Sequence, residues 1–147
     1  MYSKILVPLD GSPTAEFILA DVQELAPPLG AEVLRLQAVP SLHDIIAVSH
    51  IAMDLAQKAV AEDNARALAY LEQVAARLRT AGVNATTHLA EGPAAPAILA
   101  HCRRHDVSLI AMTTHGRSGL KRTLFGSVAD EIMRNSHLPI LMRRPAA

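Results

Sequence analysis

The chain has 147 residues, of which half are hydrophobic and 19% are charged, so we expect one folded domain spanning residues 1–147 rather than a disordered chain. Its 14 basic and 14 acidic residues cancel, so no field of the whole molecule favours nucleic acid or an anionic membrane as a partner. The single cysteine, Cys102, excludes an intrachain disulfide and a cysteine-paired zinc site. With no apolar stretch typical of a secretory leader or a membrane span, the sequence predicts a cytoplasmic protein.

The charges are distributed unevenly along the chain. Residues 1–111 hold 8 basic and 12 acidic residues, whereas residues 112–147 hold 6 basic and 2 acidic residues. Two explanations of the C-terminal excess remain open at this point, a solvated terminal helix and an anion-binding site.

The N-terminal segment predicts a strand, a turn and a helix. Residues 4–9 begin with an apolar run and predict a strand that is buried on both faces. Residues 10–13 then predict a sharp turn, in which Ser12 caps the following helix. We expect this helix to run to about Leu25, because prolines at 27 and 28 disfavour its continuation.

Residues 31–39 predict a second strand, and Arg35 and Gln37 indicate that it has one wetter face or lies near the sheet edge. Residues 40–50 show no clear period and predict a loop. Residues 52–80 carry alanine, leucine and charged residues at helical spacing and predict one long helix or a broken pair.

The C-terminal half continues this alternation, with strands predicted at 84–89, 107–112 and 138–142 and helices at 96–105 and 127–135. Strict alternation with long crossovers predicts an α/β fold, a doubly wound, five-stranded parallel sheet with helices on both faces. The first and fourth strands are the most apolar and should lie adjacent at the centre, which gives the strand order 3-2-1-4-5.

This strand order predicts the position of a site. Ligands of doubly wound sheets bind at the carboxyl ends of the strands where the order reverses, here between the segments 8–12 and 113–119. The second segment runs on to Gly126 and Ser127, where a helix begins whose first N–H groups suit a phosphate. The basic excess lies in the same segment. The sequence contains neither a P-loop motif nor a dinucleotide-binding fingerprint.

Several single residues have competing interpretations. Asp10 could bind an adenine amino group, a ribose hydroxyl or Mg²⁺, or it could cap the turn that follows it. His115 could act as a general acid or base, although the sequence places no orienting partner beside it. His101 and His105 are spaced i, i+4 and could share a metal ion, but with no third ligand in view we favour a helix end with a cation near its C-terminus.

Three segments resemble the universal stress protein family: KILVPLDGS (4–12), MTTHGRSGLKRTLFGSVADEI (112–132) and SHLPILMRR (136–144). The family's nucleotide-binding pattern is G-x2-G-x9-G-[ST]. Its second glycine falls on Gly116 and its third glycine, with the hydroxyl residue, on Gly126 and Ser127. The first glycine is replaced by Thr113, whose side chain alters the close approach that glycine allows near the ribose.

The resemblance implies a flavodoxin-like, adenine nucleotide alpha hydrolase-like domain that binds ATP with Mg²⁺. It further implies a regulatory homodimer that serves stress tolerance with weak or no hydrolysis, so we assign no catalytic residue. By position, the adenine and ribose end is lined by Pro8, Asp10 and Val39, with Thr113 beside the ribose. The phosphates are held by Gly116, Arg117, Gly126, Ser127 and Val128. Met112 and His115 are also expected to contact the nucleotide.

Two other functions remain open. The replacement at Thr113 favours a nucleotide-independent dimer that recruits an unidentified protein partner. Asp10 with a metal ion, together with His115, would instead support a slow ATPase or phosphotransferase. Dimerisation is expected through the apolar C-terminal strand, an unpaired sheet edge that invites a second copy, unless Pro139 and the arginines that follow the strand guard this edge.

Overall fold

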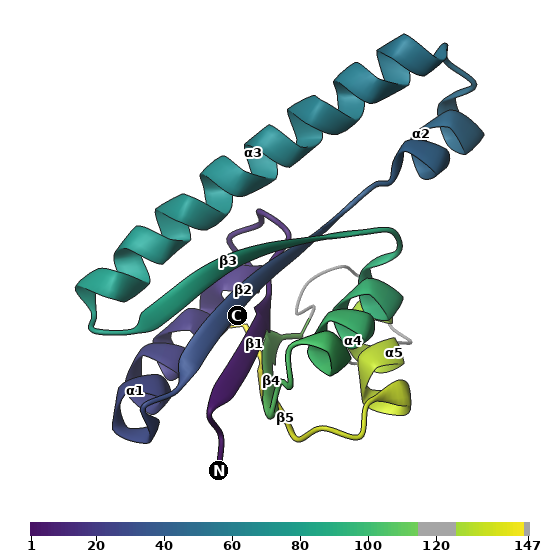
Figure 1. The fold of residues 1–147 in the computed structure, drawn as a ribbon. Coiled ribbons are helices and arrows are strands. Elements are labelled where there is room, and N and C mark those ends of the chain that lie inside the picture. The colour runs from purple at the N-terminus through teal and green to yellow at the C-terminus, as the bar shows by residue number, and fades with distance from the viewer. Residues whose placement is uncertain (115–125, 146–147) are drawn as a thin grey trace.

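A parallel sheet of five strands forms the centre of the molecule (Figure 1), in a computed structural model that describes residues 1–114 and 126–145. The strands are β1 (Lys4–Pro8), β2 (Glu32–Val39), β3 (Asn84–Glu91), β4 (Leu109–Thr113) and β5 (Ile140–Arg143). Neighbouring strands pair in parallel in the order β3-β2-β1-β4-β5. The predicted α/β class and strand order are therefore confirmed.

Helices cover both faces of this sheet (Figure 1). The described residues form the 3₁₀ turn η1 (Ala15–Ile18) and the helices α1 (Leu19–Leu29), α2 (Leu42–Ser49), α3 (Met53–Thr80), α4 (Ala94–Arg104) and α5 (Ser127–Asn135), of which α2 lies beyond the sheet. In β1, Ile5 and Val7 pack into a core with α1 and α3, whereas Leu6 packs into a second core with α4 and α5. The alternation of side chains along each strand thus builds two apolar layers, one on each face.

The end of α1 differs from the expectation that the helix stops near Leu25. Pro27 and Pro28 lie inside the last turn of the helix, which continues to Leu29. Proline has a helical φ and loses only its N–H donor, and the N–H of Gly30 still reaches the carbonyl of Pro27 at 3.0 Å. Gly30 has a φ of 61° and ends the helix, because glycine enters the left-handed region without steric cost.

The loop predicted for residues 40–50 is wrong, since the structure forms helix α2 there. A reciprocal cap starts this helix: the N–H of Asp44 donates to Ser41 Oγ at 3.1 Å, and the N–H of Ser41 donates to Asp44 Oδ2 at 2.9 Å. The local cap outweighs the weak periodicity. Helix α2 buries none of its residues and packs against α3.

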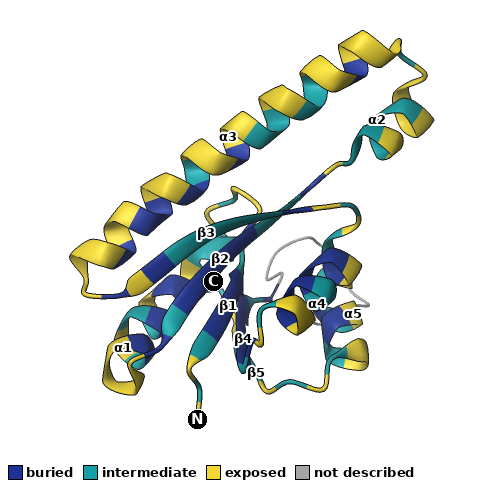
Figure 2. Ribbon diagram, in the orientation of Figure 1, coloured by how far each residue is buried: buried dark blue, intermediate teal, exposed yellow. Residues whose placement is uncertain are grey.

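Helix α3 is one continuous helix of 28 residues, which decides between the two alternatives predicted for this segment. Its buried residues lie mainly in the half that crosses the sheet, and the other half extends with α2 beyond the sheet (Figure 2). Met53 and Leu55 are exposed in that extension. The sheet therefore supports only part of α3.

Arg35 lies between β2 and α3 and is fully buried, so the wetter face predicted there is wrong. The alternative, a position near the sheet edge, agrees with β2 pairing with the edge strand β3. The Arg35 guanidinium donates to the backbone carbonyl of Leu71 and to Thr87 Oγ1, the latter at 2.7 Å. Thr87 in turn donates to Glu72 at 2.8 Å. Burial lowers the pKa of Arg35 to about 10. These partners allow a charged side chain inside the α3 layer.

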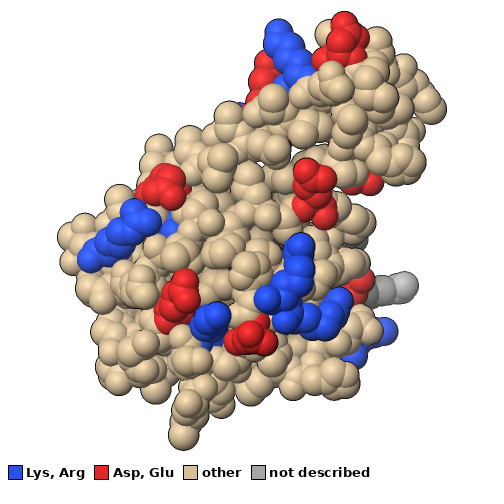
Figure 3. Space-filling model, viewed as in Figure 1, with Lys and Arg blue, Asp and Glu red and all other residues tan. Residues whose placement is uncertain are grey.

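Basic and acidic side chains are interspersed on the face of the molecule shown in Figure 3. That face presents no broad field of one sign, so electrostatic attraction there is local. Among the residues described, none of the helices combines the length and apolarity needed to cross a bilayer.

Candidate functional site

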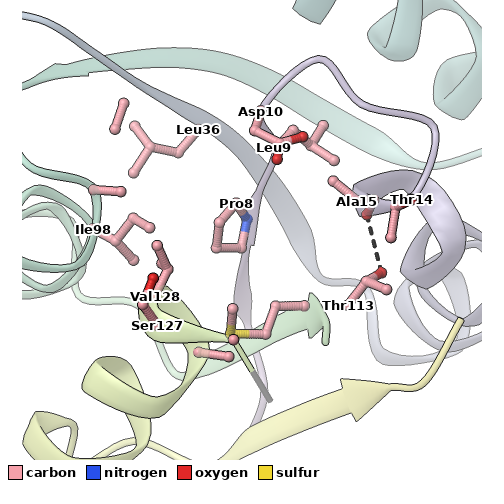
Figure 4. Close-up of a pocket in the computed structure, with 15 residues that line it drawn as sticks. Pro8, Leu9, Asp10, Thr14, Ala15, Leu36, Ile98, Thr113, Ser127 and Val128 are labelled. Carbon is pink, nitrogen blue, oxygen red and sulfur yellow. Dashed lines mark hydrogen bonds between the residues drawn. The ribbon is translucent and has the colours of Figure 1, made fainter. Parts of the chain in front are cut away.

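A pocket of about 180 Å³ opens where the strand order reverses between β1 and β4 (Figure 4). The end of β1, the end of β4 and the start of α5 all contribute to it. Its lining consists of Pro8, Leu9, Asp10, Thr14, Ala15, Leu36, Ala38, Ala94, Ile98, Met112, Thr113, Gly126, Ser127, Val128 and Ala129. The predicted crevice is therefore present at the predicted place in the fold.

Asp10 follows β1 and organises the turn beside the pocket. Its Oδ1 accepts from the N–H of Ser12 at 2.9 Å and from Ser12 Oγ at 2.6 Å. Ser12 Oγ also accepts from the N–H of Ala15, the first residue of η1, at 3.2 Å. Ser12 thus accepts one N–H at the start of η1, although the N-cap position itself is Thr14 and not the expected Ser12. Asp10 caps its turn and lines the pocket at once, and both of its bonds to Ser12 use the same oxygen.

Thr113 ends β4 and lines the pocket at the position of the first motif glycine. Its hydroxyl donates to the carbonyl of Ala15 at 3.1 Å (Figure 4). The same hydroxyl accepts from the N–H of Ile18 at 3.0 Å. The hydroxyl proton is therefore engaged by the protein backbone. The side chain connects the end of β4 to η1, rather than presenting a free hydroxyl to a sugar.

The start of α5 forms another wall of the pocket. Gly126 has a φ of 81°, which favours glycine, and its carbonyl accepts the first bond of the helix from the N–H of Asp130 at 3.0 Å. The N–H groups of Ser127, Val128 and Ala129 precede this bond and have no partner within the helix. They carry the positive end of the helix dipole, which suits an anionic group.

The remaining wall is apolar and comes from β2, β4 and α4. Leu36 and Ala38 lie on β2, Met112 on β4, and Ala94 and Ile98 on α4. Most of this wall could not be predicted from the sequence, because an apolar residue on a strand or helix gives the same signal whether it faces the core or a pocket. The missed lining residues are Leu9, Thr14, Ala15, Leu36, Ala38, Ala94, Ile98 and Ala129.

Seven of the eleven residues predicted for the site line the pocket: Pro8, Asp10, Met112, Thr113, Gly126, Ser127 and Val128. Val39 does not line it. Val39 is buried and contributes to a neighbouring cavity of about 440 Å³, which shares Ala38 with the pocket. The other predicted residues, His115, Gly116 and Arg117, lie outside the described residues.

A cluster of three histidines lies between β3 and α4. His101 and His105, spaced one helical turn apart, meet His88 of β3, so the expectation that no third ligand is in view is wrong. Each of the three offers one ring nitrogen, and these nitrogens lie within 4.8 Å of one another. His88 and His101 are thirteen positions apart in the sequence, and only the fold brings them together.

Several solved structures have the same fold as this chain. The structure of MJ0577 from Methanocaldococcus jannaschii is 26% identical, with a TM-score of 0.84, covering 100% of this chain and 99% of that chain. A universal stress protein from Archaeoglobus fulgidus in complex with dAMP is 21% identical, with a TM-score of 0.70, and the match covers 96% of this chain and 97% of that chain. One from Arabidopsis thaliana with AMP bound is 14% identical, with a TM-score of 0.67 and coverage of 99% and 93%. Another, in complex with cAMP, is 18% identical, with a TM-score of 0.71 and coverage of 99% and 98%. The last three structures are at most 21% identical to this chain, so their similarity shows a shared fold and nothing more specific.

Relatives in sequence agree with the structural neighbours. Universal stress protein YxiE from Bacillus subtilis is 30% identical over 148 residues, covering 98% of this chain and 100% of the relative. Universal stress protein MJ0531 from Methanocaldococcus jannaschii is 29% identical over 142 residues, covering 97% of this chain and 82% of the relative. The model of the universal stress protein family matches residues 1–144. The chain therefore belongs to the universal stress protein family.

Proposed function

We propose that this chain binds ATP, with Mg²⁺, in the pocket between β1, β4 and α5, and acts as a dimeric regulatory module in stress tolerance. The observation that carries the proposal is the convergence of two strand ends and a helix N-terminus at the point where the strand order reverses. Structural neighbours of the same family were solved with the adenine nucleotides dAMP and AMP. Their fold is that of this chain.

The chemistry of the walls suits the two ends of a nucleotide. The apolar wall of Leu36, Ala38 and Ile98 would pack against the adenine ring, and the free N–H groups at the start of α5 would face the phosphates. A volume of about 180 Å³ is below the roughly 300 Å³ of a site that encloses a drug-sized ligand. The base would therefore be enclosed, while the phosphates extend outward along the helix start.

The donor set also fits Mg²⁺ that arrives with the nucleotide. Mg²⁺ usually keeps several water ligands and takes only one or two carboxylates in addition to phosphate oxygens. Asp10 supplies one carboxylate at the pocket, and its bonds to Ser12 use Oδ1 alone. We assign Asp10 Oδ2 to the metal or to one of its water ligands.

Binding without fast hydrolysis agrees with the side chains of the pocket. Asp10 is the one ionisable group among the pocket-lining residues that the structure describes. The other polar side chains in this lining are hydroxyls, which need a neighbouring base to become nucleophiles. The pocket is therefore better suited to holding a nucleotide than to cleaving it.

The dimer would form through β5, the strand at one edge of the sheet. In β5 the carbonyls of Pro139 and Arg143 accept from β4. Backbone groups of successive strand residues alternate in direction, so Leu141 also faces β4, whereas the N–H and C=O of Met142 face the free edge. Met142→Pro would remove that outward donor. We expect a dimer for the natural chain and a monomer for Met142→Pro in sedimentation analysis; a monomeric natural chain would contradict this part of the proposal.

Calorimetric titration of the nucleotide-free protein with ATP, with and without Mg²⁺, tests the binding. We expect one ATP per chain and tighter binding with Mg²⁺. Ala94→Phe, which fills the pocket beside α5, should weaken binding more than about tenfold, or about 1.4 kcal/mol. Ala76→Phe, an exposed alanine on α3, serves as the matched control and should leave binding unchanged. No binding at millimolar ATP would contradict the proposal.

A second variant separates nucleotide binding from the nucleotide-independent alternative. Thr113→Gly restores the first glycine of the family pattern and removes the bonds to Ala15 and Ile18. If the natural chain binds no ATP and Thr113→Gly binds it, the natural protein acts without nucleotide. If both bind, Thr113 is an accepted replacement for the glycine.

A further inference from the structure

The cluster of His88, His101 and His105 has a feature that ordinary packing does not explain. His101 is only 4% exposed, and among the described residues neither of its ring nitrogens has a hydrogen-bond partner. An imidazole has one donor and one acceptor that lose their water on burial, so leaving both unpaired costs free energy. A ligand bound by one of these nitrogens would recover part of that cost.

Neighbouring side chains fix the orientation and the proton of His88. Thr86 Oγ1 donates to Glu32 Oε1 at 3.2 Å and lies 3.0 Å from His88 Nε2. The carboxylate is the stronger acceptor for the single hydroxyl proton, so we assign Nε2–H of His88 as the donor to Thr86 Oγ1. The lone pair of His88 is then on Nδ1. This arrangement, in which a carboxylate orients a histidine through its other nitrogen, is typical of metal ligands.

The two histidines of α4 complete a set of three. His101 and His105 project from the same side of the helix, and their rings stack with centroids 4.0 Å apart. The ring of His88 meets each of them edge-on, at centroid distances of 4.8 and 5.1 Å. The three rings therefore share one small volume at the junction of β3 and α4.

The spacing of the ligand nitrogens is close to that of a zinc site. With Zn–N distances of about 2.0–2.1 Å, a tetrahedral ion places its ligands roughly 3.4 Å apart. The three nitrogens here lie within 4.8 Å of one another and have to approach by at most about 1.4 Å. His88 and His105 are half-buried, so rotation of these two side chains can supply that movement.

We propose that His88, His101 and His105 form a binding site for a divalent transition-metal ion, with Zn²⁺ as the best-suited ion and water as the fourth ligand. Three imidazoles with one open position are an established donor set for zinc. His88 pairs in register with Leu36, which lines the nucleotide pocket, so the metal site would lie on the same face of the sheet as that pocket. The site is separate from the Mg²⁺ that accompanies ATP, and its existence does not depend on nucleotide binding.

Titration of the chelator-treated chain, produced without a histidine tag, with Zn²⁺ alone tests the site. We expect one Zn²⁺ per chain, bound at micromolar concentration. His88→Gln and His105→Gln should each weaken binding about tenfold or more. His137→Gln, which changes a histidine outside the cluster, is the matched control and should bind like the natural chain. Circular dichroism of each variant checks that the fold is kept.

Thr86→Val separates a metal site from a merely packed cluster. It leaves all three ligands in place but removes the acceptor that holds His88 in its Nε2–H form. We expect the variant to bind Zn²⁺ more weakly and to lose the Nε2–H tautomer of His88 in ¹⁵N spectra. In the natural chain, adding Zn²⁺ should shift the ¹⁵N resonance of His88 Nδ1. Absence of saturable Zn²⁺ binding, or binding that His88→Gln and His105→Gln leave unchanged, would overturn the proposal.

Discussion

The hydroxyl of Thr113, at the end of β4, donates to the carbonyl of Ala15 at 3.1 Å and accepts from the N–H of Ile18 at 3.0 Å. These residues are about a hundred positions apart in the sequence. The two bonds connect the centre of the sheet to η1 and hold one wall of the pocket in place. Thr113 occupies the position of the first glycine in the family's nucleotide-binding pattern. In this chain its side chain therefore has a structural function.

Thr113→Val should lower the free energy of unfolding by about 1–3 kcal/mol, because the carbonyl of Ala15 and the N–H of Ile18 lose their partner with little change in volume. Urea unfolding measures the loss. Thr80→Val is the matched control, since Thr80 makes its bond to the carbonyl of Ala76 in an exposed position, and its cost should stay within about 0.5 kcal/mol. Equal costs for the two variants would contradict this role of Thr113.

Arg35→Ala should lower the free energy of unfolding by about 2–5 kcal/mol, because it leaves a cavity beneath α3 and removes the donors to Leu71 and Thr87. Arg35→Met should cost clearly less, since methionine retains the packing of the long stem and removes a buried charge. Denaturant unfolding of both variants gives the comparison. If methionine is as costly as alanine, the hydrogen bonds of the guanidinium matter more than its packing.

The metal-free protein should lose stability as the pH falls from about 6.5 toward 4. Burial lowers the pKa of His101 from 6.5 to about 4, so in this window the unfolded chain binds a proton that the folded chain excludes. Urea unfolding across this range, with a chelator present, measures the slope. His101→Leu should reduce the slope of the free energy of unfolding against pH, whereas His137→Gln should leave this slope unchanged. If His101→Leu also leaves it unchanged, groups other than His101 cause the pH dependence. The carboxyls of Asp44 and Glu72, whose pKa values are lowered from 3.8 and 4.5, act mainly below this window.

Helix α2 and the adjoining end of α3 should exchange amide hydrogens faster than the sheet. Helix α2 buries no residue, and the buried residues of α3 lie mostly between Ala67 and Leu78. Few apolar contacts then oppose local opening of this extension. Hydrogen exchange followed by mass spectrometry should show early labelling of residues 42–58 and late labelling of β1 and β4. Strong protection of residues 42–58 would mean that another surface covers them.

The amino-acid sequence by itself determined the order of strands and helices and the position of the pocket. Continuous apolar runs marked the two central strands, and the reversal of strand order between them followed from that pattern. Residues 40–50 could also have been predicted as a helix from the capping pair Ser41 and Asp44, which is a local signal. Such features depend on interactions between neighbours in the chain.

The tertiary structure alone decided which distant side chains meet. Arg35 could be identified as buried only after α3 had been placed over β2, and Thr113 could be seen bonding to η1 only after β4 had been placed beside it. His88 joins His101 and His105 for the same reason. A side chain's environment is set by segments far away in the sequence, and their positions depend on packing of the whole core, which no local pattern encodes.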